Sequence, residues 1–410
     1  MPSVAFIGAG SVEFTRQLLA DLLRFPELRD LDLRLHDIDG ERLGVAEGTA
    51  RQVAERFGAT ITPTATLDRR TAVAGADFVV NMVQVGGIAA TRLDLEIPAR
   101  YGLLQTIGDT TGVGGVFRGL RTFPLLTALL GDMRELCPDA LLLNYTNPMA
   151  MNVWWASVVA PEIRTVGLCH SVYWTVHDLC ELIGVPLDGT RFRAAGVNHQ
   201  AWLLDWSRDG ESLYPRLWDR IGADPQLERR VRVEMLKRIG YFPTETSEHS
   251  SEYLSWFLRS PDQVERFRIE PLQYLGISEQ NVAEFEDARA ALADGRPLTL
   301  EEGAAEYAPQ IIHSVVTGTP REIHANVPNR GLIDNLPAGA VVEVPHLVDG
   351  SGLQAVPMGA LPPQCAALNM TNIAVQELAV KAAMERDREA AFHAVALDPL
   401  TASVLSLPQI

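Results

Sequence analysis

The sequence predicts an α/β protein with a Rossmann-type, doubly wound parallel sheet and a C-terminal α+β catalytic domain. Three observations support this prediction. Short apolar runs alternate with helix-like segments through the first 175 residues. The first run leads into a glycine turn at residues 8–10, and several later runs end in polar residues. Ligands bind beyond the carboxyl ends of the strands in such sheets, so Asp37, Asn147 and Cys169 fall where a site is expected.

Each element is justified by its local pattern. The first helix has apolar residues at helical spacing and ends before Pro26. After residue 175 the alternation weakens, residues 205–310 are mostly helical in pattern, and a long helix is expected over 371–397. We therefore expect a dinucleotide-binding domain at 1–175 and a substrate-binding catalytic domain at 176–410. The expected strands are 3–10, 31–39, 77–87, 139–149 and 164–172, with a few more within 338–362; the first two helices are 11–25 and 39–57.

Composition excludes several classes of partner. The 410 residues are 47% hydrophobic, enough for a large core in one large or two fused domains. The formal net charge of −17 and the lack of a basic run argue against nucleic acid. The longest apolar runs are far shorter than a membrane span, and the first residues lack the basic region of a signal peptide. The four cysteines show no CxxC spacing and no disulfide framework, which favours a reduced, cytoplasmic protein.

The glycine turn near the start is typical of dinucleotide binding. Gly8 permits a tight strand-to-helix turn, Gly10 lets the backbone approach a pyrophosphate, and Ser11 opens the helix whose N–H groups would face that anion. The usual third glycine is absent, because Glu13 stands there, so an ordinary turn is the alternative. Asp37 ends the next strand and suits a ribose hydroxyl, which favours NAD over NADP.

A second glycine-rich segment, "GDTTGVGGVFRGLRTFP", begins at Gly108. One interpretation is a loop followed by a helix whose basic face, with Arg118 and Arg121, is solvated. The other is a lid that closes over the nicotinamide and contacts substrate hydroxyls or a carboxylate.

Cys169 and His199 are candidate metal ligands. A lone cysteine is usually an inert buried residue and a lone histidine usually structural, but both end strand-like runs beside polar neighbours, His170 and Asn198. Two protein ligands leave positions open for substrate, as in catalytic metal centres. A thiolate with an imidazole favours Zn or Fe over Mn.

The segment "YFPTETSEHSSEYLSWF" places several acid–base groups close together: Glu245, Glu248, His249, Glu252 and Tyr253. It could be a surface helix start capped by Thr246 or Ser247. It could also be a loop that presents a tyrosine to a cleft.

These motifs, taken in order along nearly the whole chain, resemble glycoside hydrolase family 4 in its α-galactosidase-like branch. The motifs are "FIGAGS", "LHDIDGERL", "NMVQVGG", "GDTTGVGGVFRGLRT", "CPDALLLNYTNPMAMN", "VGLCHSV", "GVNHQAW", "YFPTETSEHSSEY", "GLIDNLP", "VEVPHLVD" and "TNIAVQ". The resemblance implies hydrolysis of an α-glycoside in which NAD oxidises C3 of the sugar, a base removes the C2 proton, the leaving group is eliminated from C1, and the hydride returns. It implies Mn²⁺ in place of the softer metals.

The resemblance also assigns roles by position. Cys169 and His199 match the metal ligands, and Tyr253 matches the base at C2. Relatives that act on 6-phosphosugars have an aspartate after the metal cysteine. His170 stands there in this chain, so His170 or an acid within 245–252 would supply the proton. The implied substrate contacts are Asn147, Asn198, Arg118 and Asp109, and Asn147 is also expected beside the cofactor.

Four functional classes stay open. The absence of the phosphosugar pattern favours a free α-galactoside; an α-glucuronide or α-galacturonide, held by Arg118 or Arg121, is the alternative. An NAD-dependent 2-hydroxy-acid dehydrogenase would share the fold but would need no thiolate ligand, and an NAD-binding sensor without activity would not need Cys169, His199 and Tyr253 together. We also expect a homodimer or homotetramer, with no nucleic-acid or membrane partner.

Overall fold

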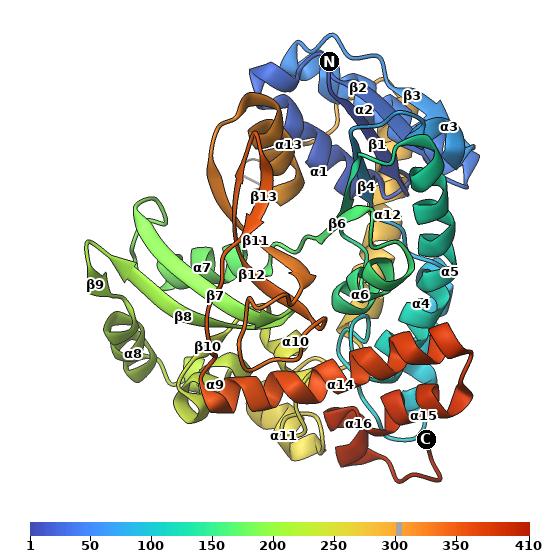
Figure 1. The fold of residues 1–410 in the computed structure, drawn as a ribbon. Helices are drawn as coiled ribbons and strands as arrows, with labels where there is room; N and C mark the ends of the chain where they lie inside the picture. Colours follow the sequence, from blue (N-terminus) through green and yellow to red (C-terminus); the bar gives the residue numbers. More distant parts are fainter. Residues whose placement is uncertain (301–305) are drawn as a thin grey trace.

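A computed structural model describes residues 1–300 and 306–410. Within these residues, thirteen strands form one mixed sheet that runs through both halves of the chain. Figure 1 shows β1, β2 and β3 at the top, α4 and α5 at the right, β7, β8 and β9 at the left, and the last helices across the bottom. The two halves are therefore joined by a shared sheet as well as by the chain.

The first half has the strand order of a dinucleotide-binding sheet. Its strands lie in the order β3-β2-β1-β4-β5-β6, and every neighbouring pair is parallel. The fold class is confirmed; β3, whose three residues are not fully buried, was not predicted. The strands are β1 (Ser3–Ile7), β2 (Asp32–His36), β3 (Thr64–Thr66), β4 (Phe78–Asn81), β5 (Leu141–Asn144) and β6 (Arg164–Gly167).

Helices flank this sheet as the right-handed crossovers of a parallel sheet require. Both expected N-terminal helices form, and α2 begins at a capping aspartate, Asp39, whose side chain accepts from Glu41 N–H and Arg42 N–H. The helices of this half are α1 (Val12–Leu23), α2 (Gly40–Phe57), α3 (Arg69–Val73), α4 (Gly87–Ala99), α5 (Gly112–Leu136), α6 (Met149–Val159) and α7 (Ser171–Leu182), with a short η1 (Pro26–Leu28).

Gly112, Gly114 and Gly115 of the second glycine-rich segment belong to α5, so the expectation of a loop or lid at these glycines was wrong. A Cβ on Gly114 would lie 2.2 Å from Gly108 O, and one on Gly115 would lie 2.3 Å from the Thr110 carbonyl carbon. These glycines therefore let the first turn of α5 press against the loop at 108–111. Among the described residues, α5 is the one helix long and apolar enough to cross a membrane, but 56% of its apolar window is buried, as in a core helix.

The second half extends the sheet with antiparallel strands. Asn326 on β11 pairs with Gly167 on β6, which links the two halves. Within the second half, Glu343 on β12 pairs with Gly196 on β7. Helix α7 spans the boundary expected between residues 175 and 176. The strands are β7 (Thr190–Val197), β8 (Gln200–Arg208), β9 (Glu211–Ser212), β10 (Phe242–Pro243), β11 (Arg321–Pro328), β12 (Val341–Asp349) and β13 (Gly352–Ala355).

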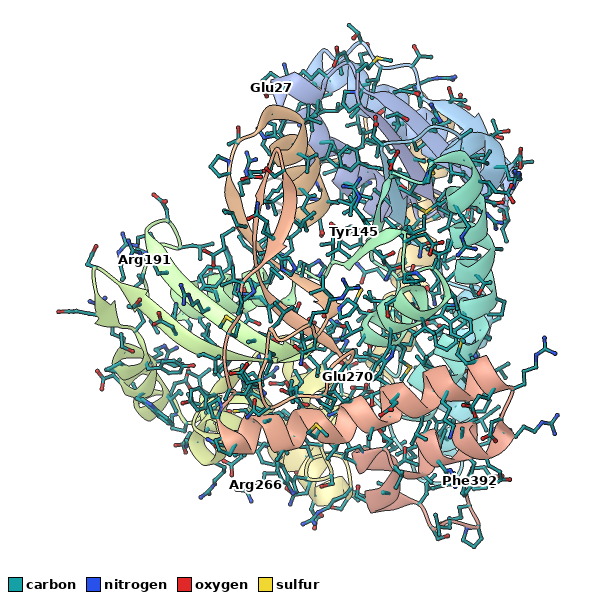
Figure 2. All side chains as sticks on the ribbon, in the orientation of Figure 1. Glu27, Tyr145, Arg191, Arg266, Glu270 and Phe392 are labelled. Carbon is teal, nitrogen blue, oxygen red and sulfur yellow. The ribbon has the colours of Figure 1, made fainter. Side chains whose placement is uncertain are left out.

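The helices of the second half partly pack back on the first. Phe285 on α12 and Ile311 on α13 share a core cluster with β1 and β2. Tyr145, labelled in Figure 2 where the halves meet, accepts the Ala308 N–H of α13 at 2.9 Å. The helices are α8 (Tyr214–Ala223), α9 (Val231–Ile239), α10 (Ser247–Glu252), α11 (Pro261–Phe267), α12 (Gln273–Ala293), α13 (Tyr307–Thr317), α14 (Pro363–Glu385), α15 (Arg388–Ala396) and α16 (Pro399–Val404), with η2 (Leu227–Arg229).

The helix expected over 371–397 is two helices. Arg386 takes a left-handed φ of 55°, which ends α14. Asp387 then accepts the Glu389 N–H and caps α15. Apolar residues continue through the break because both helices contribute to one core cluster, with Val380 from α14 and Val395 from α15, so periodicity did not reveal the turn.

Candidate active site

A cleft of about 940 Å³ lies at the carboxyl ends of the parallel strands. Gly8, Gly10, Ser11 and Asp37 line it, as the dinucleotide motif predicts. Gly8 has a φ of 88°, and a Cβ on Gly10 would lie 2.5 Å from an Asp37 carboxylate oxygen, so both positions require glycine. The Gly8–Gly10 turn leaves the backbone before α1 accessible to a pyrophosphate, and Asp37 directly after β2 can accept a hydrogen bond from a ribose hydroxyl. Both features fit a dinucleotide with a free ribose hydroxyl.

The far end of this cleft leads to the expected metal ligands. His170, directly after Cys169, lines the cleft together with Trp174 and Glu306. Asn281 and Phe285 of α12 also line it. Sequence reasoning missed these α12 residues, because no local pattern shows that a helix from the second half closes the cleft.

Cys169 and His199 come together although thirty positions separate them. Cys169 follows β6, His199 lies in the turn between β7 and β8, and Cys169 Sγ is 3.3 Å from His199 Nε2. Glu245, from the loop between β10 and α10, places Oε2 4.0 Å from that sulfur and 3.9 Å from Nε2. The segment after β6, the turn between β7 and β8, and the loop after β10 thus build one cluster of ligand atoms.

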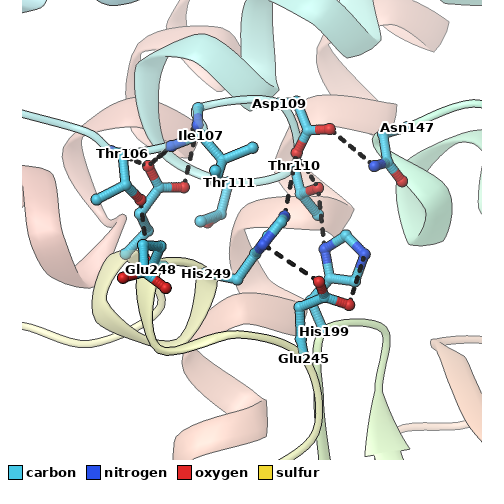
Figure 3. A network of polar contacts seen from close by, with 12 residues as sticks. Thr106, Ile107, Asp109, Thr110, Thr111, Asn147, His199, Glu245, Glu248 and His249 are labelled. Atoms are coloured by element: carbon cyan, nitrogen blue, oxygen red, sulfur yellow. Dashed lines mark hydrogen bonds and ion pairs between the residues drawn. The ribbon is translucent and has the colours of Figure 1, made fainter. Parts of the chain in front are cut away.

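The other ring nitrogen of His199 is held by the loop before α5. Nδ1 lies 3.3 Å from Thr110 Oγ1, and that hydroxyl donates to Asp109 at 2.7 Å (Figure 3). Because the hydroxyl proton goes to Asp109, Thr110 Oγ1 accepts from Nδ1–H and leaves the Nε2 lone pair toward Cys169. Burial and the nearby His249 lower the pKa of His199 to about 4, so the ring is neutral, as a metal ligand requires.

Asp109 also belongs to a hydrogen-bonded group with two other predicted substrate contacts, Asn147 and Arg118. Its second oxygen accepts from Asn147 Nδ2 at 2.8 Å, and Arg118 Nε donates to the Asn147 carbonyl at 3.2 Å. Although burial opposes the charged form, His249 and Arg118 hold the pKa of Asp109 far below its usual range. Arg121 lies apart from this group, in an ion pair with Asp94.

His249 lies between two carboxylates. Its Nδ1 is 3.5 Å from Glu245 Oε1 and its Nε2 is 3.8 Å from Asp109 Oδ1, contacts that Figure 3 shows from close by. Thr246 caps α10 by accepting the His249 N–H, as one of the two sequence interpretations expected. Burial opposes a charge on His249, but Glu245 and Asp109 raise the pKa of the imidazole to about 9.

Tyr253 is 1% exposed and lies beside the cluster, with its ring centroid 6.5 Å from that of His199. Among the described residues its hydroxyl has no hydrogen-bond partner. Burial and the nearby Asp109 raise the pKa of this phenol well above its usual value. A cation in the cluster is what would favour its anion.

The neighbouring Glu252 has a structural role, because it binds the backbone of a loop of the site. Its carboxylate accepts the backbone N–H of Thr106, of Ile107 at 2.7 Å and of Gly108 at 3.0 Å. Glu252 therefore holds the loop that carries Asp109 and Thr110.

Two further candidates face the site from its ends. His170 is half-exposed, and its Nδ1 lies 3.0 Å from Glu306 Oε1. Desolvation opposes its charge, but Glu306 raises the pKa of His170 to about 9, so the ring carries a proton at neutral pH. Asn198 is fully buried, and within the described residues neither its Nδ2 nor its Oδ1 has a partner. Such an amide is costly unless a ligand completes it.

The donor set fits a divalent cation. Sulfur, imidazole nitrogen and carboxylate oxygen converge from three separate segments, and the three ligand atoms lie within 4.8 Å of one another. The sequence pattern named two of the three; Glu245 and the supporting Thr110 were missed as part of this cluster, because only tertiary folding brings them to His199.

A dinucleotide sheet whose cleft ends beside a Cys–His–Glu cluster defines an enzyme that can combine a nucleotide cofactor with a metal. Comparison with known proteins gives the family. The model "Family 4 glycosyl hydrolase" matches residues 3–185, and the model of the family's C-terminal domain matches residues 194–401. The chain belongs to family 4 of the glycosyl hydrolases.

Its relatives span the full chain. An α-galactosidase of Bacillus subtilis (strain 168) is 40% identical, over 100% of this chain and 96% of the relative. An α-galactosidase of Rhizobium meliloti (strain 1021) is 36% identical, over 99% and 86%. The structure of a 6-phospho-α-glucosidase from gut microorganisms, in complex with NAD and Mn²⁺, superposes with a TM-score of 0.83 at 20% identity, covering 100% of this chain and 95% of that one.

Proposed function

We propose that this chain hydrolyses a free α-galactoside and uses NAD and Mn²⁺ as cofactors. The observation that carries the proposal is the pairing of Cys169 with His199 directly beside His170, which lines the dinucleotide cleft. A site of that shape brings a hydride acceptor and a Lewis acid to neighbouring carbons of one sugar ring. The two α-galactosidase relatives support the choice of sugar.

Different residues of this chain take different roles in the proposed reaction. When bound, NAD accepts and returns a hydride at C3, and the metal polarises the oxygens at C2 and C3. Cys169 and His199 hold the metal, and Asn198 and Asn147 contact the sugar hydroxyls. Gly8, Gly10, Ser11 and Asp37 hold the dinucleotide.

Proton transfer falls to the two titratable groups that flank the cluster. Tyr253, whose buried hydroxyl lacks a partner among the described residues, removes the C2 proton once C3 is a ketone. His170, protonated beside Glu306, donates to the glycosidic oxygen as it leaves C1. Water would then add its hydroxyl to C1 while Tyr253 returns a proton to C2. Because NAD would both take and return the hydride at C3, the net reaction would be hydrolysis.

The arginines favour an uncharged sugar. Arg121 already pairs with both oxygens of Asp94, and Arg118 binds the Asn147 carbonyl. A substrate carboxylate would need one of these guanidinium groups to give up or share its partner. Arg118 nevertheless stays in the proposed substrate site, through its contact with Asn147.

A panel of nitrophenyl glycosides tests the proposal. Each sugar would be assayed with and without NAD⁺, Mn²⁺ and a thiol reductant. We expect the α-galactoside to turn over only when all three are present. Turnover of an α-galacturonide or α-glucuronide instead would overturn the sugar assignment, and turnover of a 2-hydroxy acid with NADH release would overturn the reaction.

We also propose a cytoplasmic homodimer or homotetramer. The four cysteines are all free, which suits a reducing compartment. A metal-binding thiolate would itself need such a compartment, because it is readily oxidised.

A further inference from the structure

Glu245 closes a triangle of ligand atoms with the two predicted metal residues. Its sides are 3.3 Å from Cys169 Sγ to His199 Nε2, 3.9 Å from Nε2 to Glu245 Oε2, and 4.0 Å from Oε2 to Sγ. The centre of such a triangle lies about 2.2 Å from each corner, close to the roughly 2.0–2.3 Å bonds that thiolate, imidazole and carboxylate make to a divalent cation such as Zn²⁺. We propose that Glu245 is a third protein ligand of the metal, an inference that rests on the proposed function.

The backbone of Glu245 is strained in a way that places its side chain there. Its φ is 72°, a left-handed conformation that is unfavourable for a residue with a Cβ. The flanking residues are both fixed: Thr244 N–H donates to Ala201 O at 2.9 Å, and Thr246 caps α10. Glu245 N–H itself donates to Thr175 Oγ1 at 3.0 Å. A glycine would adopt this turn without strain, so a glutamate here points to a function for its carboxylate.

The two carboxylate oxygens have different neighbours. Oε1 lies 3.5 Å from His249 Nδ1, on the side away from the sulfur, while Oε2 faces Cys169 and His199. The Glu245 side chain is only 13% exposed, so water can stabilise little of the negative charge on its carboxylate. A bound cation would supply that stabilisation. His249 thus turns the carboxylate so that one oxygen is presented to the cluster.

A competing trio shares His199 but fits less well. Asp109, His199 and His249 also bring one atom each within 4.8 Å of the others. The His199 nitrogen on that side is Nδ1, which donates to Thr110, and Asp109 already accepts from Thr110 at 2.7 Å and Asn147 at 2.8 Å. The free lone pair of Nε2 is on the side of Cys169 and Glu245, so the cation belongs there.

A carboxylate ligand changes which metal the site prefers. Thiolate and imidazole alone favour softer ions, whereas a carboxylate oxygen suits Mn²⁺. Three protein ligands would leave further positions of the ion to substrate oxygens and water. Glu245 thus supplies the hard oxygen donor that a Cys–His pair lacks. Its contribution can be measured as the affinity of the site for Mn²⁺ relative to Zn²⁺.

The test measures metal binding without turnover. Mn²⁺ would be titrated into the metal-free, NAD⁺-loaded enzyme under reductant, with free Mn²⁺ followed by its EPR signal, and Zn²⁺ affinity would be measured by competition. We expect Glu245→Gln to weaken Mn²⁺ binding by at least about tenfold. Zn²⁺ binding should weaken less, because the sulfur and nitrogen ligands remain.

Two further variants are measured beside Glu245→Gln. Glu245→Gly removes the carboxylate but suits a φ of 72°, so it should lose Mn²⁺ affinity while its melting temperature stays equal or rises. Glu248→Gln is the matched control on α10: its carboxylate pairs with Arg230 at 3.6 Å instead of facing the cluster, and Mn²⁺ affinity should be unchanged.

Cys169→Ser distinguishes a failure of the Glu245 proposal from a failure of the metal centre in the proposed function. If Cys169→Ser loses Mn²⁺ while Glu245→Gln and Glu245→Gly bind it like the wild type, Glu245 is not a ligand and the proposed function stands. If Cys169→Ser also binds like the wild type, the metal centre of the proposed function is itself wrong.

Discussion

The imidazole of His199 is fixed from both sides, with Nε2 3.3 Å from Cys169 Sγ and Nδ1 3.3 Å from Thr110 Oγ1. The Thr110 hydroxyl has only one proton, and Asp109 receives it. The tautomer that presents a lone pair to the metal position is therefore selected by a residue from the other half of the chain. The same loop thus supports the metal ligand and carries the Asp109–Asn147 contact.

Thr110→Val should weaken Mn²⁺ binding by about 10–100-fold, the usual effect of losing a group that orients a metal-bound histidine. Valine keeps the shape but cannot accept from Nδ1–H. Thr110→Ser, which restores the hydroxyl, should recover most of the affinity. Equilibrium Mn²⁺ titration of the three proteins checks this; equal affinity in Thr110→Val would show that Thr110 does not orient His199.

Tyr253→Phe should lower hydrolysis by about 10²–10⁴-fold, the range for a lost general base. The hydroxyl meets no partner among the described residues, so removing it should leave the fold intact. In D₂O the intact enzyme should place deuterium at C2 of the product, and the variant should not. Near-normal turnover with C2 exchange in the variant would move the role of base to another group.

Gly114→Ala should destabilise the protein by about 1–3 kcal/mol, the range for overpacking, because the new Cβ would lie 2.2 Å from Gly108 O. Gly131→Ala in the same helix is the control: nothing lies within 4 Å of its Cβ position, and alanine should stabilise by up to about 1 kcal/mol. Chemical denaturation measures both. A neutral Gly114→Ala would mean that α5 does not press against the loop as described.

The buried His324 should make the fold sensitive to acid. Its Nε2 accepts the Ala194 N–H at 3.3 Å, and burial, with a smaller effect of His346, lowers its pKa from 6.5 to about 3. The unfolded chain takes up a proton near pH 6.5 while the folded one resists until about pH 3, so stability falls as the pH drops below 6.5. At pH 5 this costs about 2 kcal/mol.

His324→Gln tests that dependence, because glutamine can accept a hydrogen bond but does not titrate. The loss of unfolding free energy between pH 7 and pH 5 should be about 2 kcal/mol smaller in the variant. Parallel pH profiles for the two proteins would show that another group causes the acid sensitivity.

The sequence predicted what local patterns can encode. Gly8 and Asp37 both line the cleft, which the sequence could predict because the turn and the strand end are short-range features. Cys169 and His199 were paired because each ends a strand-like run beside a polar residue, His170 or Asn198. Glu245 was noticed as an acid but not as their neighbour, since only the pairing of β10 with β8 sets its distance to His199.

Two errors of the sequence reading have a physical cause. The glycines 112–115 suggest a flexible loop by composition, but they start a helix, because close packing against residues 108–110 also requires the absence of a Cβ. The break at Arg386 carries no glycine or proline, so helical periodicity ran through it. Sequence composition does not distinguish a glycine needed for motion from one needed for contact.

The measurement that most directly tests the account is hydrolysis by enzyme stripped of NAD, with absorbance at the NADH band followed during turnover. We expect no hydrolysis without the cofactor, full recovery when NAD⁺ is added, and no net NADH over many turnovers, because each hydride taken from C3 returns to it. Hydrolysis that continues without NAD, or NADH that accumulates in step with product, would contradict the proposed function.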